Sequence, residues 1–500
     1  MDSIVFGTGE AGKRILPFLE KKYHILFMVD NDEKKWGTMF ESYRVESPDE
    51  IKKHACAVII SSPKYDMEIS EQLESMGVRR DRIYTCHDLQ EEGQEFTIHS
   101  MERPLVQYDL CNEEERRTGK RKVMIFCRGY SVYSKQLIEN LSKRYDDIEF
   151  SLLTKIKKNK EKILAGQLRH IYYFQTMLDL KMILEKLPVY DAMHLLWMEK
   201  EWACLYQLIR TKAYLLNLNV GGSDFYRAGT EEKNSKKNLI DCADRIMAQT
   251  ETTARNFVEY YGDGVKNKTY ILPYGIEVLE WIDRNTIPGD IIKKKYKIPL
   301  DKVVVTCGHN ANEAHQHMKI IDAIERLPES IRKQMICVFP MTYPQGNDDY
   351  IAVLRERLER SDVNYMILTE FMNFQEMAEY ARISDIMIHV QITDQLSSAM
   401  LEEMYAGSII AAGKWLPYRS LHKMGLFFFD VEEVSDLTVL LEEIILNMEK
   451  YKKKCINNRE LVWRHSSWEN LASKWYALWT EKKISGIASV EDMLNEVWEK

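Results

Sequence analysis

The stretch from Ile386 to Ala412 constrains the fold of this chain more than any other part of its sequence. The apolar run Ile386–Val390 predicts a buried strand, and apolar residues then recur at helical spacing from Leu396 to Met404. Gly407 closes this helix, and Ile409–Ala412 begins a second strand. Two buried strands joined by one helix are typical of a parallel βαβ unit, so we predict an α/β fold.

Two acids mark the strand-to-helix turn and the helix of this unit. Asp394 lies in the turn, and Glu402 follows eight residues later. In open α/β sheets ligands bind at the carboxyl ends of strands, which is where this turn lies. The same turn adds Gln395 and Ser397 as candidate donor-binding residues. The residues alone leave two interpretations open, namely a ligand site or a strand and amphipathic helix whose acids are solvated.

The segment DQLSSAMLEEMYAG resembles the Glu-x7-Glu signature of family-4 glycosyltransferases, which have the GT-B fold. Aligning LEEMYAG on the family's Leu-Glu-Ala-Met-Ala-Cys-Gly pattern places the second acid on Glu402 and the first on Asp394, where Asp replaces Glu. The resemblance implies two Rossmann-like domains that face a cleft. It also implies a nucleotide-diphosphate sugar as donor, with Asp394 facing the sugar and Glu402 accepting from the ribose hydroxyls. GT-B enzymes usually need no metal, and the sequence contains no metal-ligand motif.

The composition limits the class of protein. Five hundred residues suggest about three domains, and 45% hydrophobic with 29% charged residues is typical of globular domains with large cores. A net charge of −8 argues against a general nucleic-acid binder. Nine cysteines without a Cys-x-x-Cys pair are typical of a reducing cytosol. The chain begins with a predicted strand and contains no apolar run near ~20 residues, so we expect a cytoplasmic protein whose membrane contact, at the inner face, is peripheral.

Residues 1–95 predict a small doubly wound unit. A buried strand precedes Gly7-x-Gly9-x-x-Gly12, and a helix and a second strand follow, which ends in Asp30. This is the context of the dinucleotide fingerprint, in which a phosphate approaches the helix N-terminus and the acid accepts from a ribose hydroxyl. The unit resembles small Rossmann-like domains fused to bacterial sugar-modifying enzymes and methyltransferases. Two interpretations stay open, a docking module or a binding domain for an NAD-type nucleotide.

The middle of the chain predicts a linker and a second α/β domain. Residues 96–121 are polar, and we expect a partly helical linker there. Strands alternate with helices over residues 122–287, which indicates a mostly parallel sheet. Gly221–Gly222 lies at a strand's carboxyl end, and either a tight turn or an acceptor-binding loop explains it. In the second case Asp224 is a candidate catalytic residue and Arg227 a further polar contact.

Two further segments of this domain carry a signal. Pro273–Glu277, the sequence PYGIE, resembles the Pro-Asn-Gly-Ile-Asp that closes the N-terminal half of GT-B transferases. Lys155–Leu164 is the most basic stretch of the chain. It predicts either a solvated face or a patch for anionic lipid headgroups, which is worth ~1 kcal/mol per basic residue.

Residues 288–470 predict the donor domain. A buried strand leads into the loop Gly308–His317, whose backbone N–H groups would face a phosphate at the following helix. Family-4 transferases place a Gly-Arg…Lys-Gly loop here, and this sequence lacks both cations. The loop more closely resembles the Gly-x-Asn-x…Gln-His loop of certain bacterial surface-polysaccharide transferases, with backbone amides, an asparagine and histidines in place of the cations. The candidate donor-binding residues are Gly308, His309, Asn310 and His315.

These signals together predict a metal-independent GT-B glycosyltransferase with an additional N-terminal Rossmann-like domain. The expected acceptor is a glycan or polyprenyl-linked sugar of a bacterial surface polysaccharide. We expect the tail, residues 471–500, to be helical and to pack its tryptophans against the N-terminal half. One alternative is a nucleotide-dependent sugar oxidoreductase or epimerase run from residues 1–95, although no Tyr-x-x-x-Lys follows. The other is a non-catalytic sugar-nucleotide sensor or scaffold.

Overall fold

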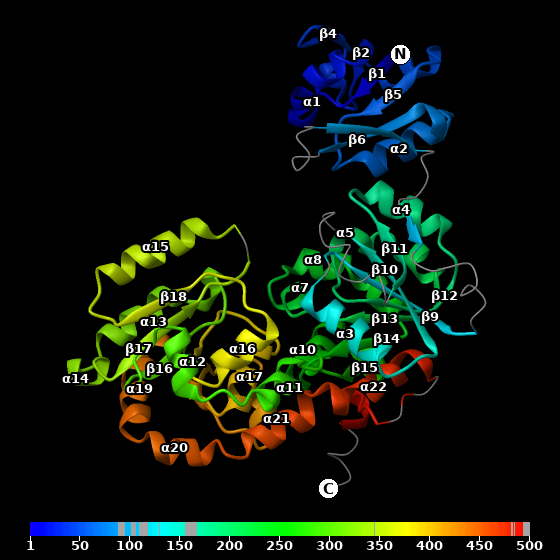
Figure 1. The fold of residues 1–500 in the computed structure, drawn as a ribbon. Coiled ribbons are helices and arrows are strands. Elements are labelled where there is room, and N and C mark those ends of the chain that lie inside the picture. Colours follow the sequence, from blue (N-terminus) through cyan, green and yellow to red (C-terminus); the bar gives the residue numbers. More distant parts are fainter. Residues whose placement is uncertain are drawn as a thin grey trace. The chain divides into compact units, whose positions relative to one another are not determined.

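The structure is a computed structural model that describes residues 1–88, 96–101, 107–109, 119–129, 131–155, 168–344, 346–481, 484 and 486–493. The chain forms two compact units. The first comprises Met1–Tyr130, Glu149–Tyr190 and Cys204–Tyr214, and the second comprises Ser131–Ile148, Asp191–Ala203 and Leu215–Lys500. The strands belong to three separate sheets, and Figure 1 labels most of their elements along the chain.

The first sheet lies in the first unit and has the strand order β3-β4-β2-β1-β5-β6-β7. Its central pairs are parallel, and only the outer pairs β3–β4 and β6–β7 are antiparallel. The α-helices are α1 (Glu10–Glu20) and α2 (Asp66–Ser75). The strands are β1 (Asp2–Phe6), β2 (His24–Val29), β3 (Met39–Phe40), β4 (Tyr43–Glu46), β5 (Ala57–Ile60), β6 (Ile83–Asp88) and β7 (Phe96–Ser100).

The first helix begins at Glu10, because Gly9 in an extended conformation serves as its N-cap. The predicted partly helical linker over residues 96–121 contains two strands, β7 and β8 (Gln107–Asp109). Pairing explains both, since β7 lies against β6 and β8 lies against β11. Residues 102–106 and 110–118 fall outside the described residues.

The second sheet has eight strands. Its order within the first unit is β9-β10-β11-β8, and within the second unit it is β15-β14-β13-β12. The strands are β9 (Arg121–Cys127), β10 (Ile148–Thr154), β11 (Leu168–Tyr173), β12 (Tyr190–Leu195), β13 (Ala213–Asn219), β14 (Arg245–Ala248) and β15 (Thr269–Ile271). The α-helices of this part are α3 (Val132–Ser142), α4 (Met177–Lys186), α5 (Lys200–Ala203), α6 (Tyr206–Arg210), α7 (Ser223–Tyr226), α8 (Thr230–Ser235), α9 (Lys237–Cys242), α10 (Glu251–Tyr261) and α11 (Val278–Arg284).

The third sheet is entirely parallel, with the order β18-β17-β16-β19-β20-β21. Alternate residues of its strands point to two apolar layers, one with α13, α15 and α19 and the other with α11, α16 and α17. The strands are β16 (Val303–Cys307), β17 (Met335–Pro340), β18 (Tyr365–Leu368), β19 (Ile386–His389), β20 (Ile409–Gly413) and β21 (Phe429–Val431). The α-helices are α12 (Gly289–Lys295), α13 (His317–Glu325), α14 (Glu329–Arg332), α15 (Asp348–Glu359), α16 (Phe374–Ala381), α17 (Ser398–Ala406), α18 (Arg419–Lys423), α19 (Leu437–Leu446), α20 (Met448–Lys454) and α21 (Asn458–Ser466).

The last strand of this sheet, β21, begins only at Phe429, although the apolar run that contains it starts at Leu426. The backbone N–H and C=O of Phe427 are both taken by the side-chain amide of Asn458, at 2.8 and 2.7 Å, so they are not available to β20. The helix after Asp394 likewise begins at Ser398 rather than at Leu396, because the Ser397 hydroxyl caps it. Its end at Gly407, in the left-handed conformation, was predicted correctly.

The terminal helix α22 (Trp468–Thr480) carries three buried tryptophans, as predicted. The Trp475 indole donates to the Pro273 carbonyl at 3.0 Å, and Trp468 lies against Gly275, where a Cβ would meet its ring. The PYGIE segment is therefore held by a helix about two hundred residues further along the chain. Among the described residues no helix is long and apolar enough to cross a membrane. The described residues do not include Trp498, and they include only Lys155 of the basic stretch Lys155–Leu164.

Candidate functional site

Asp394 lies just beyond the carboxyl end of β19 and is held by two side chains. Its Oδ2 accepts from the Tyr418 hydroxyl and lies 3.3 Å from His389 Nε2. Burial raises the pKa of Asp394, but the hydrogen bonds from His389 and Tyr418 more than offset this effect and leave the pKa below its usual value. The carboxylate is therefore ionised at neutral pH. Within the described residues Oδ1 accepts no hydrogen bond, so one oxygen stays open to a ligand.

Glu402 and Glu403 are neighbours on α17 with different surroundings. Glu403 is satisfied by protein hydroxyls, since Ser408 donates to its carboxylate at 2.7 Å and Thr306 at 3.4 Å. Glu402 is only 7% exposed, yet no described residue donates a hydrogen bond to its carboxylate. Burial and the Glu403 charge raise the pKa of Glu402 to about 8. Its oxygens are not among the fully buried polar atoms without a partner, so the carboxylate stays accessible to water or to a ligand.

Three tyrosines that the sequence analysis missed surround these acids. Tyr133, in the first turn of α3, hydrogen-bonds Ser398. Burial raises the pKa of Tyr133, and the charges of Asp394 and Glu402 raise it further. Burial raises the pKa of Tyr343, which lies in the loop after β17, and the charges of the same two acids raise it further. Tyr418 holds Asp394. The sequence carried no periodic signal for them, because each comes from a loop or helix end far away along the chain.

Four histidines cluster beside Asp394. The ring centroids of His309 and His315 are 4.3 Å apart, and those of His309 and His389 are 5.6 Å apart. Gly308 makes room for them, since a Cβ there would lie 2.7 Å from His317 Nε2. Burial lowers the pKa of His309 to about 3 and that of His317 to about 4, and it lowers the pKa of His315 as well. These three rings are neutral at pH 7 and add no charge.

The cluster is rich in unsatisfied polar atoms. The buried ring nitrogens without a hydrogen-bond partner are Nδ1 of His309, His315 and His389 and Nε2 of His317. No group of three or more His, Cys, Asp or Glu side chains in the described part of the chain is arranged to hold a metal ion. The open ring nitrogens are buried polar atoms that a ligand or a water molecule could satisfy.

The loop after β16 presents backbone amides. Asn310 Oδ1 accepts from the Asn312 N–H at 2.9 Å, so this side chain shapes the loop. The N–H groups of His309 and Asn310 make no hydrogen bond to any described residue. Two adjacent amides without a protein partner, in the loop that precedes α13, are of the kind that can bind a phosphate.

The remaining predicted residues of the turn have mainly internal contacts. The Ser397 hydroxyl accepts from the Met400 N–H at 3.2 Å and caps α17. Gln395 Oε1 accepts from Gln249 Nε2 at 3.2 Å, whereas its Nε2 is buried without a partner. Gln395 therefore still offers one donor, while Ser397 fixes the helix that carries Glu402.

Comparison with solved structures establishes the architecture. HepE of Anabaena, solved with UDP and glucose, is 14% identical, with a TM-score of 0.58 over 70% of this chain and 97% of that chain. Sucrose-phosphate synthase of Thermosynechococcus elongatus is 13% identical, with a TM-score of 0.57 over 72% and 98%. A glycosyltransferase of Rickettsia africae is 12% identical, with a TM-score of 0.58 over 72% and 98%. This chain has the GT-B fold.

A comparison with models of protein families gives a match in the N-terminal region. A family model described as C2185-like, N-terminal, matches residues 1–84, which lie before most of the GT-B part. No curated protein matches the sequence. Asp394 and the histidine cluster lie at the carboxyl ends of β16 and β19 in the third sheet, and Glu402 lies on α17, the helix that follows β19.

Asp224, in α7, has both carboxylate oxygens bonded to backbone N–H groups. Oδ2 accepts from the Met198 N–H and Oδ1 from the Gly221 N–H, both at 2.9 Å. Burial raises the pKa of Asp224 to about 6, against the opposing effect of these amides. The carboxylate holds the Gly221–Gly222 turn in place, so a catalytic role for Asp224 stays a prediction.

The glycine motif of the first unit is closed by its own residues. Asp30 Oδ2 accepts from the Thr8 N–H and from Lys35 Nζ, both at 3.0 Å, and Oδ1 accepts from the Asp32 N–H at 2.9 Å. These bonds outweigh burial and lower the pKa of Asp30 to about 2. Gly7 and Gly12 allow close packing, since a Cβ on Gly12 would lie 2.3 Å from the Gly7 carbonyl oxygen. The acid expected to bind ribose is thus already satisfied.

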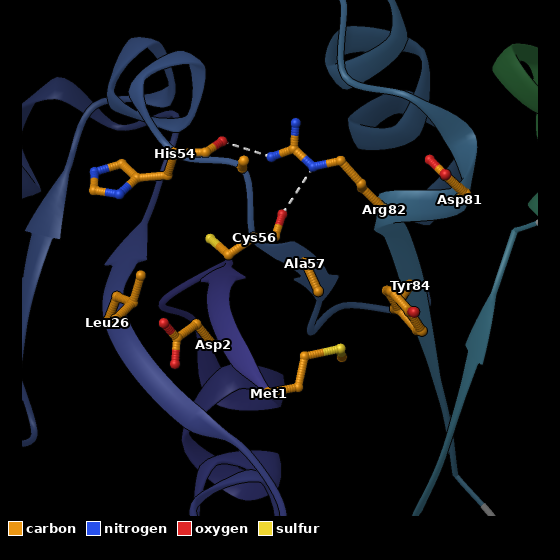
Figure 2. A pocket seen from close by; sticks show the side chains of 10 residues that line it. Met1, Asp2, Leu26, His54, Cys56, Ala57, Asp81, Arg82 and Tyr84 are labelled. Atoms are coloured by element: carbon orange, nitrogen blue, oxygen red, sulfur yellow. Dashed lines mark hydrogen bonds between the residues drawn. The ribbon is translucent and has the colours of Figure 1, made fainter.

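A pocket in the first unit lies at the amino ends of its parallel strands. Figure 2 shows Asp2, Cys56 and Arg82 around it, with the Arg82 guanidinium donating to the His54 and Cys56 carbonyls. These residues stand at or before the amino ends of β1, β5 and β6, whereas Gly7 and Asp30 follow the carboxyl ends of β1 and β2. The pocket is therefore separate from the glycine motif.

Proposed function

We propose that this protein is a metal-independent, hexosyltransferase-type glycosyltransferase. It moves a sugar from a nucleotide-diphosphate sugar to a glycan or polyprenyl-linked acceptor in bacterial surface-polysaccharide synthesis, in the cytoplasm at the inner face of the membrane. The observation that carries the proposal is the contrast on α17, where Glu403 is satisfied by hydroxyls and Glu402 is buried with none. A nucleoside ribose has the two hydroxyls that this carboxylate lacks.

The site assigns a role to each part of the donor. Glu402 accepts from the ribose, and the amides of His309 and Asn310 face the diphosphate. Asp394, ionised and held by His389 and Tyr418, presents Oδ1 to the sugar. In the transition state the departing diphosphate gains negative charge while the sugar ring gains positive charge. An ionised carboxylate beside the ring and open amides beside the phosphates stabilise this separation of charge.

A ligand screen tests the proposal. HepE was solved with UDP-glucose, so UDP-sugars come first, followed by TDP- and GDP-sugars. A ligand at 100 times its Kd stabilises the folded protein by ~2.7 kcal/mol, which a thermal-shift assay detects. We expect one nucleotide class to raise Tm and the bound donor to be slowly hydrolysed. No Tm shift with any of the three classes would contradict the proposal, and binding without hydrolysis or transfer would favour the scaffold.

The N-terminal region is expected to be dispensable for transfer. Gly9 is the N-cap of α1, a position that Asp favours, and nothing lies within 4 Å of a Cβ there. Gly9→Asp should therefore fold normally while placing a negative charge where a phosphate would sit. We expect donor hydrolysis within about threefold of wild type and no change in Tm on adding NAD to either protein. Loss of activity in folded Gly9→Asp would show that this region is integral to the enzyme.

The oxidoreductase alternative is weakened by the same region. Asp30 is saturated by Thr8, Asp32 and Lys35, and a ribose would have to displace these bonds. Each lost charge-assisted hydrogen bond costs ~1.5–3 kcal/mol. We therefore favour the docking-module interpretation of residues 1–95.

A further inference from the structure

The donor loop lacks a positive charge. A nucleoside diphosphate carries at least two negative charges, and the loop Gly308–His317 contains no arginine or lysine. Its histidines cannot supply the charge, because burial keeps His309, His315 and His317 neutral at pH 7. Asp394 adds a negative charge next to them. Open amides orient a phosphate, but they carry no net charge and do not neutralise the diphosphate and Asp394. A cation from another part of the chain is therefore needed.

Arg227 is an arginine of the described residues that lies beside this loop and comes from a distant part of the chain. It follows α7 in the other GT-B half, and its Nε donates to Thr393 Oγ1 at 2.9 Å. Thr393 directly precedes Asp394. The Arg227 charge also lowers the pKa of His315, so the guanidinium lies close to the donor loop as well.

The guanidinium has unused donors. Only its Nε is engaged, and no described carboxylate forms an ion pair with its Nη groups. The side chain is exposed in the ligand-free protein, although arginine has five N–H donors in a fork that matches phosphate. Neighbouring cations of the same half differ, since Lys236 is bonded to Glu232 and to the Asp224 carbonyl. Lys233 lies over the rings of Phe225 and Tyr260.

We propose that Arg227 binds the donor diphosphate across the cleft and takes the place of the two cations missing from the Gly308–His317 loop. This inference rests on the proposed function and reassigns a residue that the sequence placed in an acceptor loop. The Nε bond to Thr393 orients the fork, and the two Nη groups bind phosphate oxygens above the amides of His309 and Asn310. The diphosphate thereby joins the two halves of the site.

The test compares UDP with uridine by isothermal titration calorimetry on the full chain. Arg227→Gln should weaken UDP roughly 10- to 150-fold and change uridine by less than about twofold, since only the diphosphate meets the guanidinium. Arg227→Lys should bind UDP with an affinity between those of wild type and Arg227→Gln, because lysine keeps the positive charge but lacks the forked guanidinium. UDP binding by the wild type should also weaken with added salt.

Two control variants separate phosphate binding from other roles. Lys233→Gln removes one positive charge from the same half, away from the loop, and should leave both affinities unchanged. Thr393→Val removes only the bond to Arg227 Nε, so it should cost much less than Arg227→Gln. Equal UDP affinity in Arg227→Gln and wild type would overturn the inference, as would equal losses for UDP and uridine or a loss in Thr393→Val as large as in Arg227→Gln. A wild type that binds none of UDP, TDP and GDP would instead overturn the proposed function and the inference with it.

Discussion

Replacing Asp394 with alanine is expected to lower kcat for donor hydrolysis or transfer by roughly 100- to 1,000-fold, the usual cost of removing one preorganised electrostatic contact. In the proposed function Asp394 faces the sugar that moves, so its contact would strengthen as charge develops in the transition state. Donor KM should change by less than about fivefold, because the bonds to ribose and diphosphate remain. Steady-state kinetics of Asp394→Ala and Asp394→Asn with the preferred donor measure both quantities.

A matched variant tests how much the positioning of the Asp394 carboxylate contributes. Tyr418→Phe removes the hydroxyl that donates to Asp394 Oδ2 but leaves the carboxylate and the nearby His389 in place. We expect a smaller loss of kcat, about 10-fold, from poorer positioning. Wild-type kcat in a folded Asp394→Ala protein would remove Asp394 from the site.

Replacing Glu402 with alanine is expected to weaken donor binding roughly 10- to 150-fold, since charge-assisted bonds to a carboxylate contribute ~1.5–3 kcal/mol each. The loss should appear in Kd for the nucleoside diphosphate alone, because the contact is with the ribose and not with the sugar. Calorimetry with UDP and with its 2′-deoxy analogue measures this. The deoxy analogue should bind wild type more weakly than UDP and should no longer differ from UDP in Glu402→Ala.

The neighbouring acid is the control for this variant. Glu403→Gln disturbs a carboxylate that Ser408 and Thr306 already satisfy. We expect it to lower Tm and to leave UDP affinity within about threefold. A Glu402→Ala protein that binds UDP as tightly as wild type would show that Glu402 is only part of the core.

Glu402 should also make donor binding depend on pH. Burial and Glu403 raise its pKa to about 8 in the free protein, and the ionised form is the better acceptor for two ribose hydroxyls. Donor affinity should therefore rise as pH increases from 6 to 8 and level off above it, and binding should release a proton. Affinity rises with pH because Glu402 is mostly protonated below pH 8 and must lose this proton before its carboxylate can accept from both hydroxyls. Glu402→Gln has no such group, so its profile should be flat.

Local patterns in the sequence determined the order and type of most elements. Helical spacing and Gly407 defined α17, and runs of apolar residues defined the central strands of each sheet. These signals are local, because period and capping depend on residues a few positions apart. The placement of Asp394 in the turn after a strand and of Glu402 on the following helix came from the same patterns.

Tertiary structure decided which of the acids are left for a ligand. Asp224 and Asp30 looked as accessible in sequence as Asp394, yet backbone amides and Lys35 satisfy them. Glu402 and Glu403 are adjacent, and the structure alone shows that Ser408 and the distant Thr306 both donate to Glu403 and not to Glu402. The start of β21 was set by Asn458, about thirty residues beyond it. The physical reason is that the partner of a buried polar group comes from another element, and no local period encodes which element that is.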